Sequence, residues 1–207
     1  MKLSINQSFQ ENASNQSLLI LVDSEQVQHA SNTYQINNLN TIIESTQFKA
    51  TLAETLPLIG QVSNCTHSVF VGIGKATELK AAKLSKIAQT IIKSSQKKFK
   101  QISVDISSLP QELHYLFALS LTQAAYAFDE YKSKKNEFIL EQVNLIATNS
   151  PLNQQQLTLI EAIQSGQAWI TQSTEHLFQP QELRLHQRDG VHFDKGCYLG
   201  QEIVARL

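Results

Sequence analysis

The side chains best suited to metal or thiol chemistry lie near the carboxyl end of the sequence. His186, His192 and Cys197, with Asp189 between them, could be drawn as a metal site. Their spacings match no usual zinc pattern, so we expect no bound metal here. Lys195 stands two residues before Cys197 and could lower the pKa of that thiol, which would make it reactive. A free, unreactive thiol is the simpler interpretation.

A glycine-lysine pair, Gly74-Lys75, follows an apolar run and precedes a long helical pattern. Helix N-termini with glycine turns bind anions, so this turn could cradle a phosphate. The surrounding residues lack the remaining glycines and the Lys-Ser/Thr ending of a P-loop. We therefore predict a tight strand-to-helix turn rather than a phosphate site.

Two basic runs could contact nucleic acid. Cations near a helix C-terminus are favoured by the helix dipole and usually face water. The formal net charge of -1 gives no field to gather nucleic acid or an anionic membrane. A solvated face is preferred, and nucleic-acid binding stays open as an alternative. The lysines concerned are Lys93, Lys97, Lys98 and Lys100, with Phe99 among them, and Lys132, Lys134 and Lys135.

The other titratable candidates are isolated from one another. Asp129 and Glu130 are adjacent, so on a helix they point in different directions and cannot act as a paired acid and base. Cys65 and Cys197 lie far apart in sequence, which favours reduced thiols in a cytoplasmic protein. Four single histidines are predicted to be surface or half-buried side chains: His29, His67, His114 and His176.

The elements that would position these groups alternate between strands and helices. Strands are predicted over residues 17–23, 68–72, 101–106 and 138–147. Helices are predicted over 38–49, after Lys75, after the Ser107–Pro110 start signal, and after Ser150-Pro151. Their apolar positions are Ile42, Ile43 and Phe48; Leu84, Ile87, Ala88, Ile91 and Ile92; Leu113, Leu116, Phe117, Leu121, Ala124 and Ala125; and Leu159, Ala162 and Ile163.

This alternation predicts an α/β sandwich with a mixed, largely parallel sheet flanked by helices. The pattern stops near Gly166, which indicates a domain over residues 1–165 and a short irregular extension over 166–207. The extension is too small to fold alone. The amino-terminal residues lack the basic end and apolar run of a secretory signal, and no stretch approaches the roughly 20 apolar residues that span a bilayer.

Two segments of the first domain resemble the N-terminal domain of the leucyl (cytosol) aminopeptidase family. VFVGIGKATELKAAKLSKIAQ, from Val69 to Gln89, resembles that family's strand, glycine-lysine turn and helix. AAYAFDEYKSKK, from Ala124 to Lys135, is similar to a more specific family segment. The resemblance covers about residues 1–165 and implies an α/β sandwich in a family of metallopeptidases that act in peptide turnover.

The same resemblance implies that the chemistry lies elsewhere. The family binds two divalent metals, Zn or Mn, in a larger C-terminal domain, through an Asn-Thr-Asp-Ala-Glu-Gly-Arg stretch and a preceding Asp-Lys-Gly segment. The Asn-Thr-Asp-Ala-Glu-Gly-Arg stretch does not occur in this sequence, and the Asp-Lys-Gly tripeptide at residues 194–196 precedes no such stretch. A two-metal site needs several convergent carboxylates. We therefore assign no catalytic residue, expect no cofactor, and expect the chain to be inactive as a peptidase. The family forms hexamers; a monomer or weak oligomer is expected here.

The extension resembles a different family, the YgfZ folate-binding relatives of the glycine-cleavage T protein. The resemblance rests on a signature of adjacent residues, with Phe178, Pro180 and residues 203–206 around it. It implies tetrahydrofolate binding and a role in iron–sulfur enzyme maintenance and tRNA modification, as an alternative function. A fusion near 165–167 is indicated, by natural rearrangement, sequence error or engineering. The signature comprises Lys195, Gly196, Cys197, Tyr198, Leu199, Gly200, Gln201 and Glu202.

Overall fold

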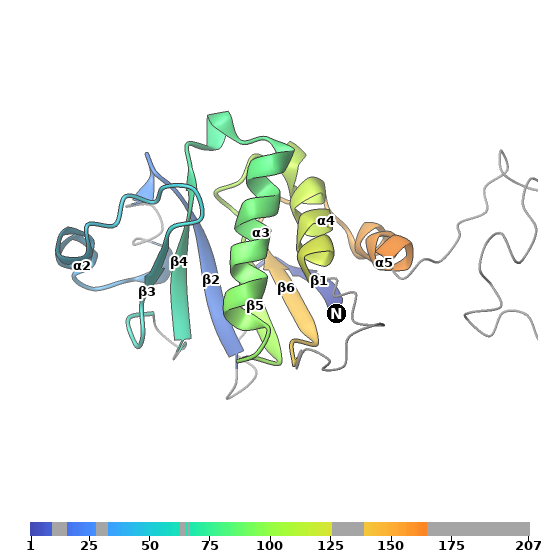
Figure 1. Ribbon diagram of the computed structural model, residues 1–207, viewed down its shortest axis with the longest axis horizontal. Helices are drawn as coiled ribbons and strands as arrows, with labels where there is room; N and C mark the ends of the chain where they lie inside the picture. Colours follow the sequence, from blue (N-terminus) through green and yellow to red (C-terminus); the bar gives the residue numbers. More distant parts are fainter. Residues whose placement is uncertain (10–15, 28–32, 63–64, 66, 126–138, 165–207) are drawn as a thin grey trace, which may run out of the picture. The chain divides into compact units, whose positions relative to one another are not determined.

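The computed structural model describes residues 1–9, 16–27, 33–62, 65, 67–125 and 139–164 (Figure 1). The chain divides into two compact units, Met1–Thr158 and Leu159–Leu207. The first unit holds the whole sheet and is described below. Of the second unit the structure describes residues 159–164, which form the end of a helix that begins in the first unit.

A six-stranded sheet in the order β1-β6-β5-β2-β4-β3 forms the centre of the first unit. All neighbouring strands are parallel except β3, which pairs antiparallel with β4 at one edge. The predicted mixed, largely parallel sheet is confirmed. The strands are β1 (Lys2–Asn6), β2 (Gln16–Asp23), β3 (Thr55–Pro57), β4 (His67–Gly74), β5 (Gln101–Asp105) and β6 (Gln142–Ile146).

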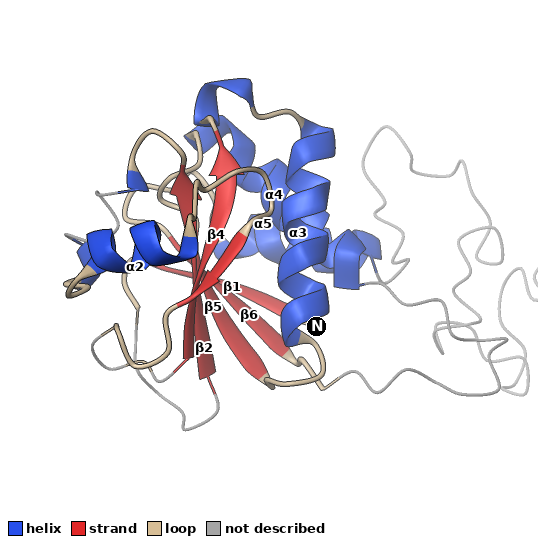
Figure 2. Ribbon diagram, turned by 60° about the vertical axis from the view of Figure 1, so that its left-hand side comes forward, coloured by secondary structure: helices blue, strands red, loops and turns tan. Residues whose placement is uncertain are grey.

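Helices cover both faces of this sheet (Figures 1 and 2). Helix α3 (Ala81–Ser95) and helix α4 (His114–Ala125) lie side by side on one face, and α2 (Leu39–Thr46) lies on the other. Each crossover from β4 to β5 and from β5 to β6 therefore runs through a helix on the same side. Two short 3-10 turns, η1 (Ala76–Glu78) and η2 (Gln111–Leu113), precede α3 and α4, and α5 spans Gln154–Gln164.

The apolar residues predicted for α3 are all buried, because they form one stripe at spacings of three and four. On the opposite face of the sheet, α2 closes a second apolar cluster over β2 and β4. That cluster includes Leu18 and Ile20 of β2, Phe70 of β4 and Leu39 of α2. Phe48, predicted as a helix position, lies beyond the end of α2 but is buried in the same cluster.

Several expectations about the helix ends were wrong. Pro110 precedes η2 in an extended conformation rather than occupying the first turn of a helix, so α4 begins only at His114. At α5 the hydrogen bonds of the first turn come from Asn153, not from Ser150. The Asn153 side chain accepts from the Gln156 N–H at 2.9 Å, and the Gln156 side chain accepts from the Asn153 N–H at 3.1 Å. This reciprocal pair is a capping box.

Leu116 was expected on the buried face of α4 but is 39% exposed. The residues of α4 that are buried include polar ones, Ser120 and Thr122, whose hydroxyls bond to carbonyls of the preceding turn. Because these polar residues are buried, the apolar pattern predicted the wrong buried face for α4.

Among the described residues no helix combines the length and the hydropathy that a membrane span requires.

Candidate functional site

The carboxyl edge of the parallel strands is where α/β proteins usually bind ligands, at the point where successive connections diverge to opposite faces. Here that point lies between β2 and β5, which are neighbours in the sheet. Each of these strands ends in a buried aspartate, Asp23 on β2 and Asp105 on β5, each 7% exposed. Two buried carboxylates at this place are the first candidates for chemistry.

Asp105 is already engaged by its own surroundings. The Tyr34 hydroxyl donates to its Oδ2 at 2.6 Å, and the Ser107 N–H donates to its Oδ1 at 2.8 Å. Burial, followed by the negative charge of Asp105, raises the pKa of the Tyr34 phenol well above its ordinary value of 10.0. The phenol therefore stays protonated. It donates a hydrogen bond to the Asp105 carboxylate and does not act as a base.

Asp23 accepts hydrogen bonds from the backbone of the loops after β2 and β4. Its Oδ1 accepts from the Glu25 N–H at 2.7 Å and its Oδ2 accepts from the Ala76 N–H at 3.1 Å. A phosphate at the Gly74-Lys75 turn would need free backbone N–H groups there, and the Ala76 N–H already donates to the Asp23 carboxylate. Lys75 turns to Glu25, with Nζ and Oε1 2.8 Å apart. The local charge and hydrogen bonding thus disfavour an anion.

The turn itself differs from the prediction in detail. Gly74 has a φ of 70°, a left-handed conformation that favours glycine. The chain then passes through η1 before α3 begins at Ala81, so the connection is longer than a tight strand-to-helix turn.

Within the described ranges no group of three or more His, Cys, Asp or Glu side chains could hold a metal ion. The residues His186, Asp189, His192 and Cys197, for which no bound metal is expected, lie outside the described residues. So do the folate-family signature residues Lys195 to Glu202 and the pair Asp129 and Glu130. Their arrangement stays a prediction.

His114 contradicts the expectation of a surface or half-buried histidine, because it is only 1% exposed. Its Nε2 lies 3.1 Å from the Leu109 carbonyl oxygen and its Nδ1 lies 2.8 Å from Ser150 Oγ. A carbonyl can only accept, so Nε2 carries the proton and Nδ1 accepts from Ser150. Burial lowers the pKa of His114 below its ordinary value of 6.5. The ring is a neutral structural link between α4 and the loop after β6.

His67 is exposed as predicted, and Cys65 is a buried free cysteine whose Sγ donates to the His67 carbonyl oxygen at 3.1 Å. His29 and His176 lie outside the described residues.

The basic run at the end of α3 borders a groove of about 610 Å³ between α3 and the strands β2, β3 and β4. Lys98 and Phe99 line the groove with His67, and the Phe99 ring meets the His67 ring edge-on at 5.5 Å between centroids. Lys100 pairs with Glu141, whose Oε1 lies 3.6 Å from Lys100 Nζ. An aromatic already packed against a side chain and a lysine already paired are poor nucleic-acid contacts. The second basic run lies outside the described residues.

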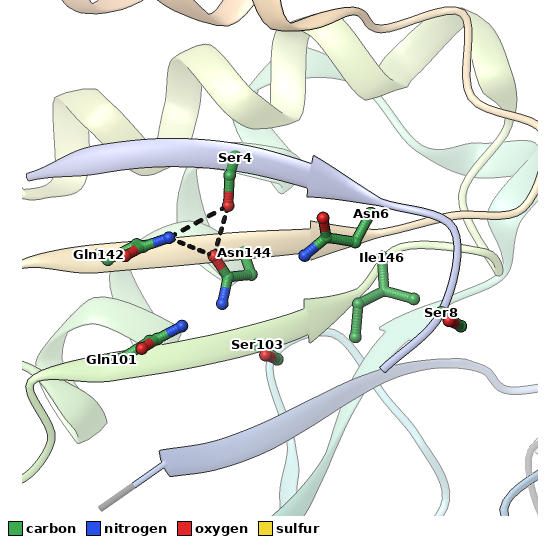
Figure 3. Close-up of a pocket in the computed structure, with 8 residues that line it drawn as sticks. All are labelled: Ser4, Asn6, Ser8, Gln101, Ser103, Gln142, Asn144 and Ile146. Carbon is green, nitrogen blue, oxygen red and sulfur yellow. Dashed lines mark hydrogen bonds between the residues drawn. The ribbon is translucent and has the colours of Figure 1, made fainter. Parts of the chain in front are cut away.

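A second cavity, of about 250 Å³, opens on the α2 side of the sheet over β1, β6 and β5 (Figure 3). Hydroxyl and carboxamide groups dominate its lining: Ser4, Asn6, Ser8, Gln101, Ser103, Gln142 and Asn144, with Ile146. The sequence prediction missed these residues. The sequence pattern that marks them is a polar residue at every second position of each strand, and these positions fall on one face of the sheet. They are Ser4 and Asn6, Gln101 and Ser103, and Gln142 and Asn144.

Comparison with known proteins identifies the family. Residues 19–135 match the model of the cytosol aminopeptidase family, N-terminal domain. A probable cytosol aminopeptidase of Acinetobacter baumannii (strain ATCC 17978) is 62% identical over 169 residues, which are 82% of this chain and 35% of that protein. The chain thus spans about a third of the length of the curated relatives it matches.

Solved structures share the fold. A mutant of tomato leucine aminopeptidase superposes with a TM-score of 0.61 at 11% identity, covering 80% of this chain and 36% of that one. The bottromycin maturation enzyme BotP in complex with Mn superposes with a TM-score of 0.51 at 14% identity, covering 72% and 30%. At these identities the likeness concerns the fold alone.

The second resemblance has partial support. A tRNA-modifying protein YgfZ of Buchnera aphidicola subsp. Schizaphis graminum is 37% identical over 76 residues, which are 37% of this chain and 20% of that protein. A match of 76 residues is longer than the stretch 166–207, so it begins upstream of residue 166. The family match, by contrast, falls on the sheet and helices described above, and through that domain the chain belongs to the cytosol aminopeptidase family.

Proposed function

We propose that this polypeptide is a non-catalytic domain: it contributes to a cytoplasmic aminopeptidase without hydrolysing peptides itself. The match of residues 19–135 to the family's N-terminal domain carries the proposal. The name of these relatives, probable cytosol aminopeptidase, supports both the location and the activity proposed for the whole protein. In that protein the two divalent metals would be held outside the region matched here.

The chemistry of the two buried carboxylates supports the same conclusion. A two-metal hydrolase needs several acidic side chains that converge on the ions and bridge them. Asp23 and Asp105 each accept two hydrogen bonds from neighbouring groups of the protein. Moving either carboxylate toward an ion would leave a buried N–H or O–H without its acceptor, which costs free energy.

A peptidase assay tests the proposal directly. The 207-residue polypeptide would be purified from a host without leucyl aminopeptidase and incubated with leucine p-nitroanilide and added Mn²⁺ or Zn²⁺. No release of p-nitroaniline above a parallel mock purification is expected. Hydrolysis that co-elutes with the polypeptide, scales with its concentration and stops on chelation would refute the proposal.

A second candidate is a YgfZ-like function, which the 76-residue match to the tRNA-modifying protein favours. We propose domain boundaries of 1–165 and 166–207, with the fusion near residues 165–167. Titration calorimetry with a reduced folate tests this candidate. Binding that is lost in Lys195→Ala or Cys197→Ala would support it, and no heat of binding would remove it.

Nucleic-acid binding is the weakest candidate, because the formal net charge of -1 supplies little affinity for phosphates. A gel-shift titration at low salt with no retarded band would exclude it. The oligomeric state expected for the polypeptide, monomer or weak oligomer, is tested by sedimentation.

A further inference from the structure

One face of the sheet changes character halfway across. Under α2, the face carries apolar residues such as Leu18 and Ile20 on β2 and Phe70 on β4. Over β5, β6 and β1 the same face carries Ser103, Asn144 and Ser4 in register, and Gln101 opposite Gln142. Parallel strands are normally apolar on both faces, because helices cover both. Core packing does not explain the polar half.

Asn144 is the most buried carboxamide on this polar half, with 6% of its surface exposed. Its Oδ1 accepts from the Ser4 hydroxyl and from Gln142 Nε2, the latter at 2.7 Å. Since the oxygen faces these donors, the amide nitrogen must face the other way. In Figure 3 it points toward Gln101 and Ser103, into the 250 Å³ cavity.

The Asn144 Nδ2 has no hydrogen-bond acceptor among the described residues. Buried donors in folded proteins are nearly always paired, so an unpaired one aimed into a cavity indicates a group that binds there. Asparagine is also a poor strand residue, and an apolar side chain at this position would remove the cost of the unpaired donor.

The lining determines what kind of ligand fits. None of the lining residues is ionisable or aromatic, so neither a charge nor a flat ring finds a specific partner. The Gln101 side chain faces the same space from β5, so two carboxamides are available to a ligand oxygen and its neighbouring N–H. The cavity holds on the order of eight water volumes, which limits the ligand to a few heavy atoms beyond a dipeptide backbone.

We propose that this cavity, the sheet-face amide pocket, binds a short uncharged peptide through its backbone amides, with Asn144 donating to a peptide carbonyl oxygen. A peptide backbone alternates donors and acceptors as the lining does, and it carries no charge. Binding in this pocket does not depend on whether the polypeptide cleaves peptides. A failure to detect peptide binding and a failure of the proposed function are therefore separate results.

The test uses the ¹⁵N-labelled 207-residue polypeptide titrated with N-acetyl-glycyl-glycine amide and followed by NMR. Saturable shifts of the β1, β5 and β6 amide signals are expected, with a dissociation constant on the order of 1 mM for a ligand of this size. Asn144→Asp keeps an oxygen for Ser4 and Gln142 but removes the free donor. It should weaken binding about tenfold, which corresponds to the loss of one hydrogen bond.

Asn37→Asp is the matched control, because it makes the same change at an exposed asparagine that does not line the pocket, and it should leave the affinity unchanged. If Asn144→Asp does not fold, Gln101→Glu removes the second carboxamide nitrogen from a half-buried side chain and should also weaken binding. No saturable shift, equal affinity in the Asn144 and Asn37 variants, or equally tight binding of glycerol or acetate would each overturn the proposal.

Discussion

Gly72 is the position where a single added carbon should do most damage to the sheet. It lies in β4, where its N–H donates to the Glu54 carbonyl and its own carbonyl accepts from the Ala53 N–H, both at 2.8 Å. A β-carbon at Gly72 would lie 2.3 Å from the Thr51 carbonyl oxygen and 2.4 Å from the Ala50 carbonyl carbon. These are backbone atoms, so no side-chain rotation can relieve the contact.

We predict that Gly72→Ala lowers the free energy of unfolding by about 2–3 kcal/mol. This value is the upper part of the usual cost of overpacking, reduced by the small stabilisation that alanine gives by restricting the unfolded chain. In a domain of this size that corresponds to a fall in Tm of about 5–10 °C. Urea denaturation followed by circular dichroism measures the change, and an unaltered slope would show that the unfolded state is unaffected.

Gly60→Ala is the matched control for this prediction. Gly60 has a φ of 69°, but an added β-carbon there meets no atom within 4 Å. Its cost is therefore only the strain of a left-handed alanine, about 1 kcal/mol once the effect on the unfolded chain is included. If Gly72→Ala were no more destabilising than Gly60→Ala, the close approach of the 50–51 backbone to β4 would be wrong.

Three further changes probe the buried polar groups and the helix cap. Burial lowers the pKa of His114, so the unfolded chain takes up the proton before the folded one does. The contribution of His114 to stability should therefore be complete above about pH 6.5 and fall as the pH drops through that value. Urea midpoints measured between about pH 7.5 and 5.5 should fall less in His114→Gln than in the unsubstituted protein. Tyr34→Phe leaves Asp105 without its hydroxyl donor and should cost about 1.5–3 kcal/mol in the same assay. Asn153→Ala should cost about 1 kcal/mol, and an unchanged midpoint would contradict its role at the start of α5.

The long elements were predictable because their residues repeat one burial pattern. The stripe Leu84, Ile87, Ile91 predicted α3, and the apolar run 17–23 predicted β2. β1 was missed because its alternation puts Ser4 and Asn6 on the polar half of the sheet, where it resembles an exposed loop. β3 was missed because it has only three residues and ends in a proline, which an edge strand tolerates.

The buried polar groups could not be predicted in the same way. Nothing in the residues near His114 shows that Ser150 and the Leu109 carbonyl will satisfy both ring nitrogens, since the Ser150 contact joins segments 36 residues apart. The sheet-face amide pocket likewise depends on the register of β1, β6 and β5, which only the three-dimensional pairing supplies. Local pattern predicts elements, whereas these sites arise from contacts between elements.

Metal content is the most direct test of the claim that this polypeptide carries no peptidase centre. The purified 207-residue chain would be dialysed to equilibrium against Mn²⁺ or Zn²⁺ and its bound metal measured by mass spectrometry. We expect no stoichiometric metal, because the buried carboxylates of Asp23 and Asp105 are held by hydrogen bonds of the protein. Two ions bound tightly per polypeptide would contradict it.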